Sequence, residues 1–84
     1  MIFSPRAWKQ YLYWHEQDRR IAKKINALVV ECTRTPFSGT ASPEPLKNQL
    51  SGWWSRRIDK EHRLVYRLEG DDLIIAQCRY HYDE

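Results

Sequence analysis

The sequence predicts an α+β fold in which two N-terminal helices pack on a twisted antiparallel sheet. Three observations carry this prediction. Apolar residues recur at helical spacing over residues 5–32, a proline-rich stretch follows, and beyond it the apolar pattern has a period of two. Because 84 residues support one modest core, we expect a single domain over residues 1–84.

Each helix has recognisable ends. Ser4 can cap a first helix that starts with proline, and we expect that helix over Pro5–His15. Asp18 can cap a second helix, and Thr35-Pro36 ends it because proline disfavours the helical conformation of the residue before it. The polar side of this helix carries four cations, Arg19, Arg20, Lys23 and Lys24. They form either a solvated helix face or a docking surface for ribosomal RNA.

The second half of the chain reads as strands. Residues 36–45 contain three of the four prolines and therefore predict a loop. Beyond it, strands are expected over residues 53–58, 62–68 and 73–82, joined as two consecutive hairpins, with residues 46–49 and Ile2-Phe3 as candidate edge strands. Trp53 and Trp54 fall on opposite faces of one strand, so one is a core residue, and the pattern does not choose between them.

Charge and cysteine content limit the class of protein. The net charge is +3, with seven basic and three acidic residues in residues 1–35 against seven and eight in the remainder. Cys32 and Cys78 match neither a zinc nor a disulfide pattern, so we expect two buried free thiols. No apolar run reaches the length of a membrane span. We therefore expect a cytoplasmic protein with no metal or other cofactor.

Strand alternation brings cations to one side of the expected sheet. The residues assigned to the core are Leu64, Tyr66 and Leu68 in one strand and Ile74, Ala76, Cys78 and Tyr80 in the next. Arg63, Arg79 and His81 would then share the face that points away from the helices. We expect this face to hold the reactive groups, with Arg79 as a contact for RNA.

Three side chains fit the chemistry of cutting RNA without a metal. That reaction needs a base for the 2′-hydroxyl proton, a cation for the charge that develops on the phosphate, and an acid for the leaving 5′-oxygen. Glu44, held between two prolines, fits the base, Arg63 fits the cation and His81 fits the acid. Lys47 follows Glu44 closely enough to contact the same phosphate.

Structural interpretations compete with these assignments. Glu44 also fits an ordinary loop carboxylate, Arg63 a solvated strand cation, and His81 a polar residue near the end of a strand. His15 and His62 fit surface or capping positions better than catalytic ones. The residue types alone leave these alternatives open.

Seven segments resemble those of one known family. They are YLYW at 11–14, KKIN at 23–26, TRTPF at 33–37, PEPLK at 43–47, LSGWWSRRI at 50–58, EHRLVY at 61–66 and CRYHY at 78–82. In their order and spacing the chain resembles the YoeB-type toxins of the RelE/ParE superfamily, essentially from end to end.

The resemblance implies a fold, an activity and partners. It implies an RNase-like sheet on two helices, a ribosome-dependent mRNA interferase that cuts mRNA in the A site, a YefM-type antitoxin and a homodimer. The site residues that it implies are Glu44 as general base, Arg63 as the phosphate-stabilising cation, His81 as general acid, Tyr82 as a stacking residue, and Lys47 and Arg57 as supporting phosphate contacts.

The chain departs from the family pattern at its ends. Asp83 and Glu84 extend past the tyrosine at which the family commonly ends, and they bring negative charge towards the expected site. Only residues 1–3 are left for a first strand, which makes that strand marginal.

Two other functions compete with RNA cleavage. A non-catalytic ParE-like toxin that binds DNA gyrase would have the same fold, because one scaffold can host both activities. The co-occurrence of Glu44, Arg63, His81 and Tyr82 argues against it, since a gyrase binder does not need that set. A binding protein inactivated by the acidic tail is the third interpretation.

Overall fold

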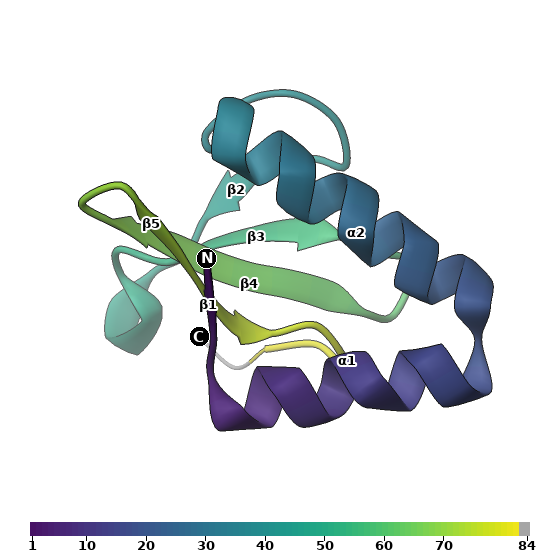
Figure 1. Cartoon of the computed structure of the whole chain (residues 1–84). Helices are drawn as coiled ribbons and strands as arrows, with labels where there is room; N and C mark the ends of the chain where they lie inside the picture. The colour runs from purple at the N-terminus through teal and green to yellow at the C-terminus, as the bar shows by residue number, and fades with distance from the viewer. Residues whose placement is uncertain (83–84) are drawn as a thin grey trace.

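The computed structural model describes residues 1–82, in which two helices pack against a five-stranded sheet (Figure 1). In chain order the elements are β1 (Ile2–Phe3), α1 (Pro5–Gln17), α2 (Arg19–Arg34), β2 (Glu44–Pro45), the 3₁₀-helix η1 (Asn48–Leu50), β3 (Trp54–Arg57), β4 (Arg63–Glu69) and β5 (Asp72–Gln77). The predicted α+β class with two leading helices is confirmed. Asp83 and Glu84, the predicted acidic tail, lie outside the described residues.

Both helix starts are those that the sequence predicts. The Ser4 hydroxyl accepts a hydrogen bond from the Ala7 N–H at 3.0 Å, and the Asp18 carboxylate accepts from two N–H groups in the first turn of α2. α1 ends at Gln17 rather than His15, because the Asp18 N–H still donates to a carbonyl of its last turn at 2.8 Å. α2 ends before Thr35, as predicted.

The sheet has the strand order β1-β5-β4-β3-β2 and is mixed rather than wholly antiparallel. β1 pairs in parallel with β5, whereas all other pairs are antiparallel. The expected antiparallel pairing fails at this edge because β1 is not joined to β5 by a hairpin. Both helices lie between β1 and the other strands in the sequence, and a long helical connection allows two strands to pair in parallel. The Ser4 N–H extends the pairing by donating to the Ile75 carbonyl at 2.8 Å.

The predicted edge strand over residues 46–49 is wrong, and β2 lies inside the predicted loop instead. Glu44 pairs with Ser55, and Pro45 pairs with Trp54. Proline has no N–H to donate, but an edge strand tolerates it because one side of that strand needs no partner. The 3₁₀-helix η1 occupies the second half of the segment that was expected to be a strand.

β5 ends five residues earlier than expected and points different side chains at the core. Leu73 and Ile75 are buried there, whereas Ile74 and Ala76 of the predicted core set are not in the core cluster. A bulge in the β4·β5 pairing shifts the alternation, so Cys78 is in the core as predicted. The expected alternation therefore fails around the bulge.

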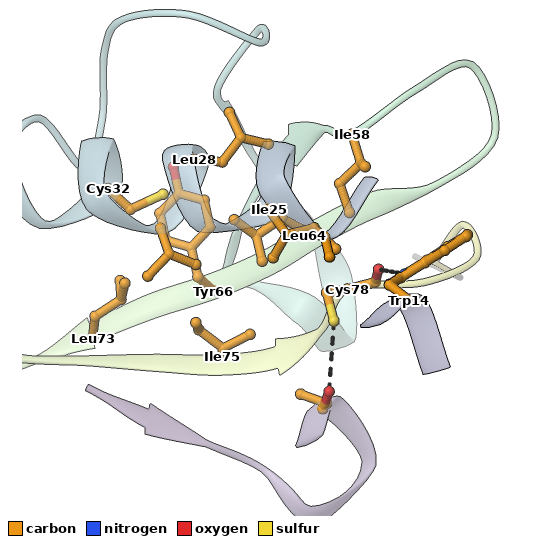
Figure 2. Close-up of a cluster of buried hydrophobic side chains, with 13 residues drawn as sticks. Trp14, Ile25, Leu28, Cys32, Ile58, Leu64, Tyr66, Leu73, Ile75 and Cys78 are labelled. Atoms are coloured by element: carbon orange, nitrogen blue, oxygen red, sulfur yellow. Dashed lines mark hydrogen bonds between the residues drawn. The ribbon is translucent and has the colours of Figure 1, made fainter. Parts of the chain in front are cut away.

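The core lies between the helices and the sheet. Figure 2 shows apolar side chains of α2 meeting those of β4 and β5. Its most buried members include Ile25, Cys32, Leu64, Tyr66, Leu73, Ile75 and Cys78. Both cysteines are buried and free, as predicted. Within residues 1–82, every helix is too short or too polar to cross a membrane.

The tryptophan question is settled by the pairing of β3. Trp54 lies opposite the buried Tyr66 and packs against the core. Trp53 lies outside that cluster, and the Arg67 guanidinium sits over its ring at 4.8 Å from the centroid. Trp54 is therefore the core residue of the two.

Candidate active site

A row of paired residues marks the face of the sheet that points away from the helices, which we call the distal face. Glu44 on β2 pairs with Ser55 on β3, and Ser55 pairs in turn with Val65 on β4. Gln77 on β5 completes the row as the partner of Val65. Paired residues project to the same side of a sheet, and all four are absent from the core cluster.

Tyr82 reaches the middle of this row. Its hydroxyl lies 3.4 Å from Oγ of Ser55, the cross-strand partner of Glu44. The His81 imidazole stacks on the Tyr82 ring, with centroids 4.6 Å apart and planes inclined by 27°. The chain returns over the sheet here because β5 ends at Gln77. A carboxylate, a phenol and an imidazole are thus gathered on the distal side.

Two guanidinium groups lie beside this row on adjacent strands. Arg57 and Arg63 are cross-strand partners, so both belong to the distal face. Arg57 is exposed, whereas Arg63 is only 8% exposed. Nη1 of Arg63 donates to three carbonyl oxygens of the β3–β4 turn at 2.8 to 3.4 Å. A fixed cation next to an exposed one suits an anionic ligand such as a phosphate.

Buried Arg56 fixes the loop that leads to Glu44. Its side chain is on the core side of β3 and is completely buried. Its guanidinium donates to carbonyl oxygens of three loop residues, Thr35, Ser38 and Thr40. It also forms an ion pair with Glu31 and donates from Nε to the Tyr66 hydroxyl at 3.1 Å. The loop is therefore bound to α2, β3 and β4 before it enters β2.

Glu31 is the anionic end of this network. The Thr40 hydroxyl and N–H donate to its carboxylate at 2.7 and 2.9 Å, and with Arg56 they hold the pKa of Glu31 below its ordinary value of 4.5. Gly39 has a φ of +108°, and a Cβ there would lie 3.0 Å from Oε2 of Glu31. Only glycine fits this close approach without strain.

Tyr66 supplies the neutral end of the network. Burial raises the pKa of Tyr66 to about 12, so its hydroxyl stays protonated. That hydroxyl donates to the Pro36 carbonyl at 2.6 Å while it accepts from Arg56. The start of the loop is thus held from β4 as well as from β3.

Arg79 does not lie where strand alternation places it. Its guanidinium is 3.5 Å from the centroid of the Tyr13 ring on α1 and 4.5 Å from that of Tyr80. The expectation that Arg79 faces outward beside Arg63 is wrong, because the strand has already ended at Gln77 and its alternation no longer applies.

The remaining predicted residues are exposed and are not members of the row of paired residues. Lys47 is exposed just before η1. The four cations of α2, Arg19, Arg20, Lys23 and Lys24, are exposed, and the buried residues of that helix are on its other side. They consequently lie on the side of α2 away from its buried residues, and the charge of Lys24 reaches Asp59 of the β3–β4 turn, where it helps to lower the pKa of that carboxyl. Among residues 1–82 there is no group of three or more His, Cys, Asp and Glu side chains placed to hold a metal ion.

Sequence reasoning missed Ser55 and Arg56. Ser55 joins β2 to Tyr82, but a strand serine carries no catalytic signature, and its pairing depends on a strand that the prolines concealed. Arg56 was not singled out and stood only within the segment LSGWWSRRI at 50–58. Its burial follows from partners as much as 25 residues away in sequence, so no local pattern could reveal it.

The structural comparisons define the class. The fold matches the YoeB/ParE toxin from Agrobacterium tumefaciens with a TM-score of 0.93 and 45% identity, covering 96% of each chain. It matches a chain of the YoeB–YefM complex from Staphylococcus aureus with a TM-score of 0.90 and 43% identity, covering 96% of this chain and 94% of the other. These neighbours define a small α+β toxin of a bacterial toxin–antitoxin system.

The sequence comparisons narrow this to one family. Residues 3–82 match the family described as YoeB-like toxin of bacterial type II toxin–antitoxin system. Toxin YoeB of Escherichia coli strain K12 is 60% identical over 82 residues, 98% of each chain. Toxin YoeB of Streptomyces coelicolor is 52% identical over the same length and coverage. The chain belongs to the YoeB-like toxin family, which confirms the family predicted from its motifs.

Proposed function

We propose that this chain is a ribosome-dependent endoribonuclease that cleaves mRNA in the A site by metal-independent acid–base chemistry. The observation that carries the proposal is the meeting of two distant segments at Ser55. The strand that bears Glu44 pairs with it, and the Tyr82 hydroxyl contacts it. The cations Arg57 and Arg63 on the same face supply the charge that a phosphodiester requires.

The proposed reaction is an attack by the 2′-hydroxyl on the adjacent phosphate. Glu44 takes the 2′-hydroxyl proton while the 2′-oxygen bonds to phosphorus, and Arg63 stabilises the negative charge on the phosphate oxygens. The bond from phosphorus to the 5′-oxygen then breaks as His81 donates its proton to that oxygen. The products are a 2′,3′-cyclic phosphate and a 5′-hydroxyl.

Three other residues are assigned supporting roles. Tyr82 stacks on a base of the substrate or on His81, and its contact with the His81 ring supports the second role. Arg57 and Lys47, both exposed, contact neighbouring phosphates. Arg79 is packed against Tyr13, so any contact of its guanidinium with RNA would be at the border of the site.

A cell-free translation assay tests the proposed activity. The protein is added to a reporter mRNA, and 5′ ends are mapped by primer extension. We expect cuts in phase with codons, and a loss of cleavage of about 10²- to 10⁴-fold in His81→Ala and Arg63→Ala. Glu44→Ala is expected to lose less, because groups of the ribosome can share the role of base.

Two controls sharpen this assay. Lys9→Ala removes an exposed cation from α1 and should cleave like the unmodified protein. Arg63→Lys keeps the charge and loses the fork of donors, so it separates charge from geometry. Intact message together with inhibited DNA supercoiling would replace the nuclease proposal by a gyrase-binding toxin.

We also propose a YefM-type antitoxin and a homodimer for this chain. The support is that the Staphylococcus aureus relatives are described as a YoeB–YefM complex and as a YoeB dimer. Co-expression with the antitoxin encoded beside the gene, followed by light scattering, tests both. A monomer that fails to retain the antitoxin would contradict both proposals.

The cations of α2 are proposed to dock on ribosomal RNA. Their exposure on the side of α2 away from its buried residues supports this role, because it leaves them accessible to a polyanion. Reversing the charge of Arg19 and Lys23 should reduce the salt dependence of ribosome binding. An unaltered dependence would assign these residues to ordinary solvated surface.

A further inference from the structure

The segment that carries His81 has no regular structure of its own. After β5 ends at Gln77, residues 78–82 form neither helix nor strand. Tyr80 has a φ of +69°, in the left-handed region that residues other than glycine rarely adopt. A backbone in this conformation persists only where surrounding groups hold it.

Side chains from α1 and from the β3–β4 turn hold the start of this turn. Gln10 Oε1 accepts from the Cys78 N–H at 2.8 Å, and Trp14 Nε1 donates to the Cys78 carbonyl at 2.9 Å. His62 Nδ1 accepts from the Tyr80 N–H at 2.7 Å. Together with the Arg63 N–H, which donates to the Tyr80 carbonyl at 3.0 Å, they fix the backbone up to one residue before His81.

Gln77 contacts the backbone of His81 itself. Its Nε2 lies 2.9 Å from the Arg79 carbonyl oxygen, 3.1 Å from that of Tyr80 and 2.7 Å from that of His81. Within residues 1–82, no other hydrogen bond reaches a backbone atom of His81. Gln77 is 6% exposed and stands in the distal row with Ser55. Three consecutive carbonyls thus converge on one amide.

We propose that Gln77 is a positioning residue that sets the place of His81 in the reaction. The inference rests on the proposed nuclease function and adds a residue to it. Gln77 touches neither the phosphate nor the leaving oxygen. It holds the His81 backbone, so that the imidazole stays stacked on Tyr82, whose hydroxyl is fixed at Ser55.

The chemistry of the amide makes the role specific to glutamine. The Gln77 amide nitrogen carries two hydrogens, which the three carbonyl oxygens share. Gln77→Met keeps the length of the side chain and removes both donors. Gln77→Glu keeps the shape and turns a carboxylate oxygen towards those carbonyls, which repels them. A misplacement of about 1 Å in a catalytic group costs up to about 10²-fold in rate. We therefore expect kcat to fall about 10- to 100-fold, with KM changed less than about twofold because the phosphate contacts remain.

The test compares unmodified protein, Gln77→Met and Gln77→Glu in single-turnover cleavage on programmed ribosomes, with Gln17→Met as the matched control. Gln17 is exposed at the end of α1, so its variant should keep full kcat and KM. The ring resonances of His81 in NMR spectra give a readout that does not depend on cleavage. They should move towards the positions of an unstacked imidazole in Gln77→Met, while the far-UV spectrum stays unchanged.

The outcomes separate the two proposals. If the unmodified protein cleaves and Gln77→Met retains its kcat, or if the His81 resonances do not move, the role of Gln77 is overturned and the nuclease stands. If the unmodified protein does not cleave on the ribosome, the nuclease proposal fails, and the role of Gln77 in it fails too. A lower kcat with shifted His81 resonances supports the positioning role even if Gln77→Glu does not fold.

Discussion

Two irregular segments deliver the candidate catalytic groups, and in each of them one long side chain contacts three backbone carbonyls. The loop from Thr35 to Thr40, which leads to Glu44, is bound through three carbonyls by Arg56. The turn that leads to His81 is bound through three carbonyls by Gln77. The same arrangement thus appears on β3 and on β5, the two strands that flank β4, once with a charged donor and once with a neutral one.

Arg56 and Gln77 differ in charge and in the side of the sheet on which they lie. Arg56 lies on the core side of β3, completely buried, where its charge needs Glu31 and every carbonyl around it. Gln77 lies on the distal face and carries no charge. The difference teaches that the position of Glu44 is tied to global stability, whereas that of His81 is set locally and can be altered without unfolding the protein.

Removing the Arg56 guanidinium should have the largest effect on stability. Arg56→Met leaves the Glu31 carboxylate without its cation and three loop carbonyls without a donor, and should cost about 3–5 kcal/mol. Urea unfolding followed by tryptophan fluorescence measures this. Arg57→Met, at the exposed neighbouring position, should cost less than about 0.5 kcal/mol. A loss below about 1 kcal/mol in Arg56→Met would break the comparison.

Tyr66→Phe should have the next largest effect. It removes a buried hydroxyl that makes two hydrogen bonds, which is worth about 1–2 kcal/mol. Burial raises the pKa of this hydroxyl from 10.0 to about 12. Its stabilisation is therefore complete below pH 10 and is lost as the pH rises through about 12.

Unfolding measurements at alkaline pH give a separate test of the Tyr66→Phe prediction. Burial also raises the pKa of Cys78, from 9.0 to about 12, so stability falls with rising pH in both proteins. The contribution of Cys78 cancels in the difference between their unfolding free energies, which then reports Tyr66 together with Cys32, the buried thiol that interacts with it. We expect that difference to shrink between pH 10 and about 12. A constant difference would mean that Tyr66 is no more buried than it is in the unfolded chain.

Glu31→Gln probes the anionic partner and should have a smaller effect, since this carboxylate is 29% exposed. Hydrogen bonds from Thr40, then the charge of Arg56, lower its pKa from 4.5. Its contribution is present above pH 4.5 and is lost as the pH falls through the lower value of the folded state. The unfolding midpoints of the two proteins should converge in acid, as seen by circular dichroism. Parallel curves would show that Arg56 is not held by this charge.

The smallest change is expected for Gln77→Met. Water can reach the carbonyls of a surface turn, so the free energy of unfolding should change by less than about 1 kcal/mol. Thermal unfolding of Gln77→Met and Arg56→Met under the same conditions compares the loss of stability in the two variants. A loss in Gln77→Met as large as that in Arg56→Met would show that both segments belong to the core.

Predictions from the sequence are confirmed where the controlling groups are local. Ser4 and Asp18 cap helices within three residues of their own positions, so the pattern of neighbours was sufficient. β2 and the end of β5 were missed, because they depend on the partner strand and on a bulge. The periodicity of one strand contains neither.

The candidate site shows the same division. Glu44 and Arg63 were chosen for their chemistry, and both strands present them on the distal face. Arg79 was misplaced because alternation was extended past the end of a strand. Arg56 and Gln77 carry no chemical signature, and their roles come from backbone carbonyls that only the folded chain brings to them.

The parallel pairing of β1 with β5 has a consequence for the folding of the chain during its synthesis. Ser4 donates to the carbonyls of Ile75 and Ala76, the latter 72 positions further along the chain. A polypeptide leaves the ribosome from its N-terminus, and contacts of such separation close late. A nascent chain that stops before Ile74 therefore lacks the residues that pair with Ile2 and Phe3 and accept from Ser4. We expect such a truncated chain to leave the edge of the sheet at β1 unpaired.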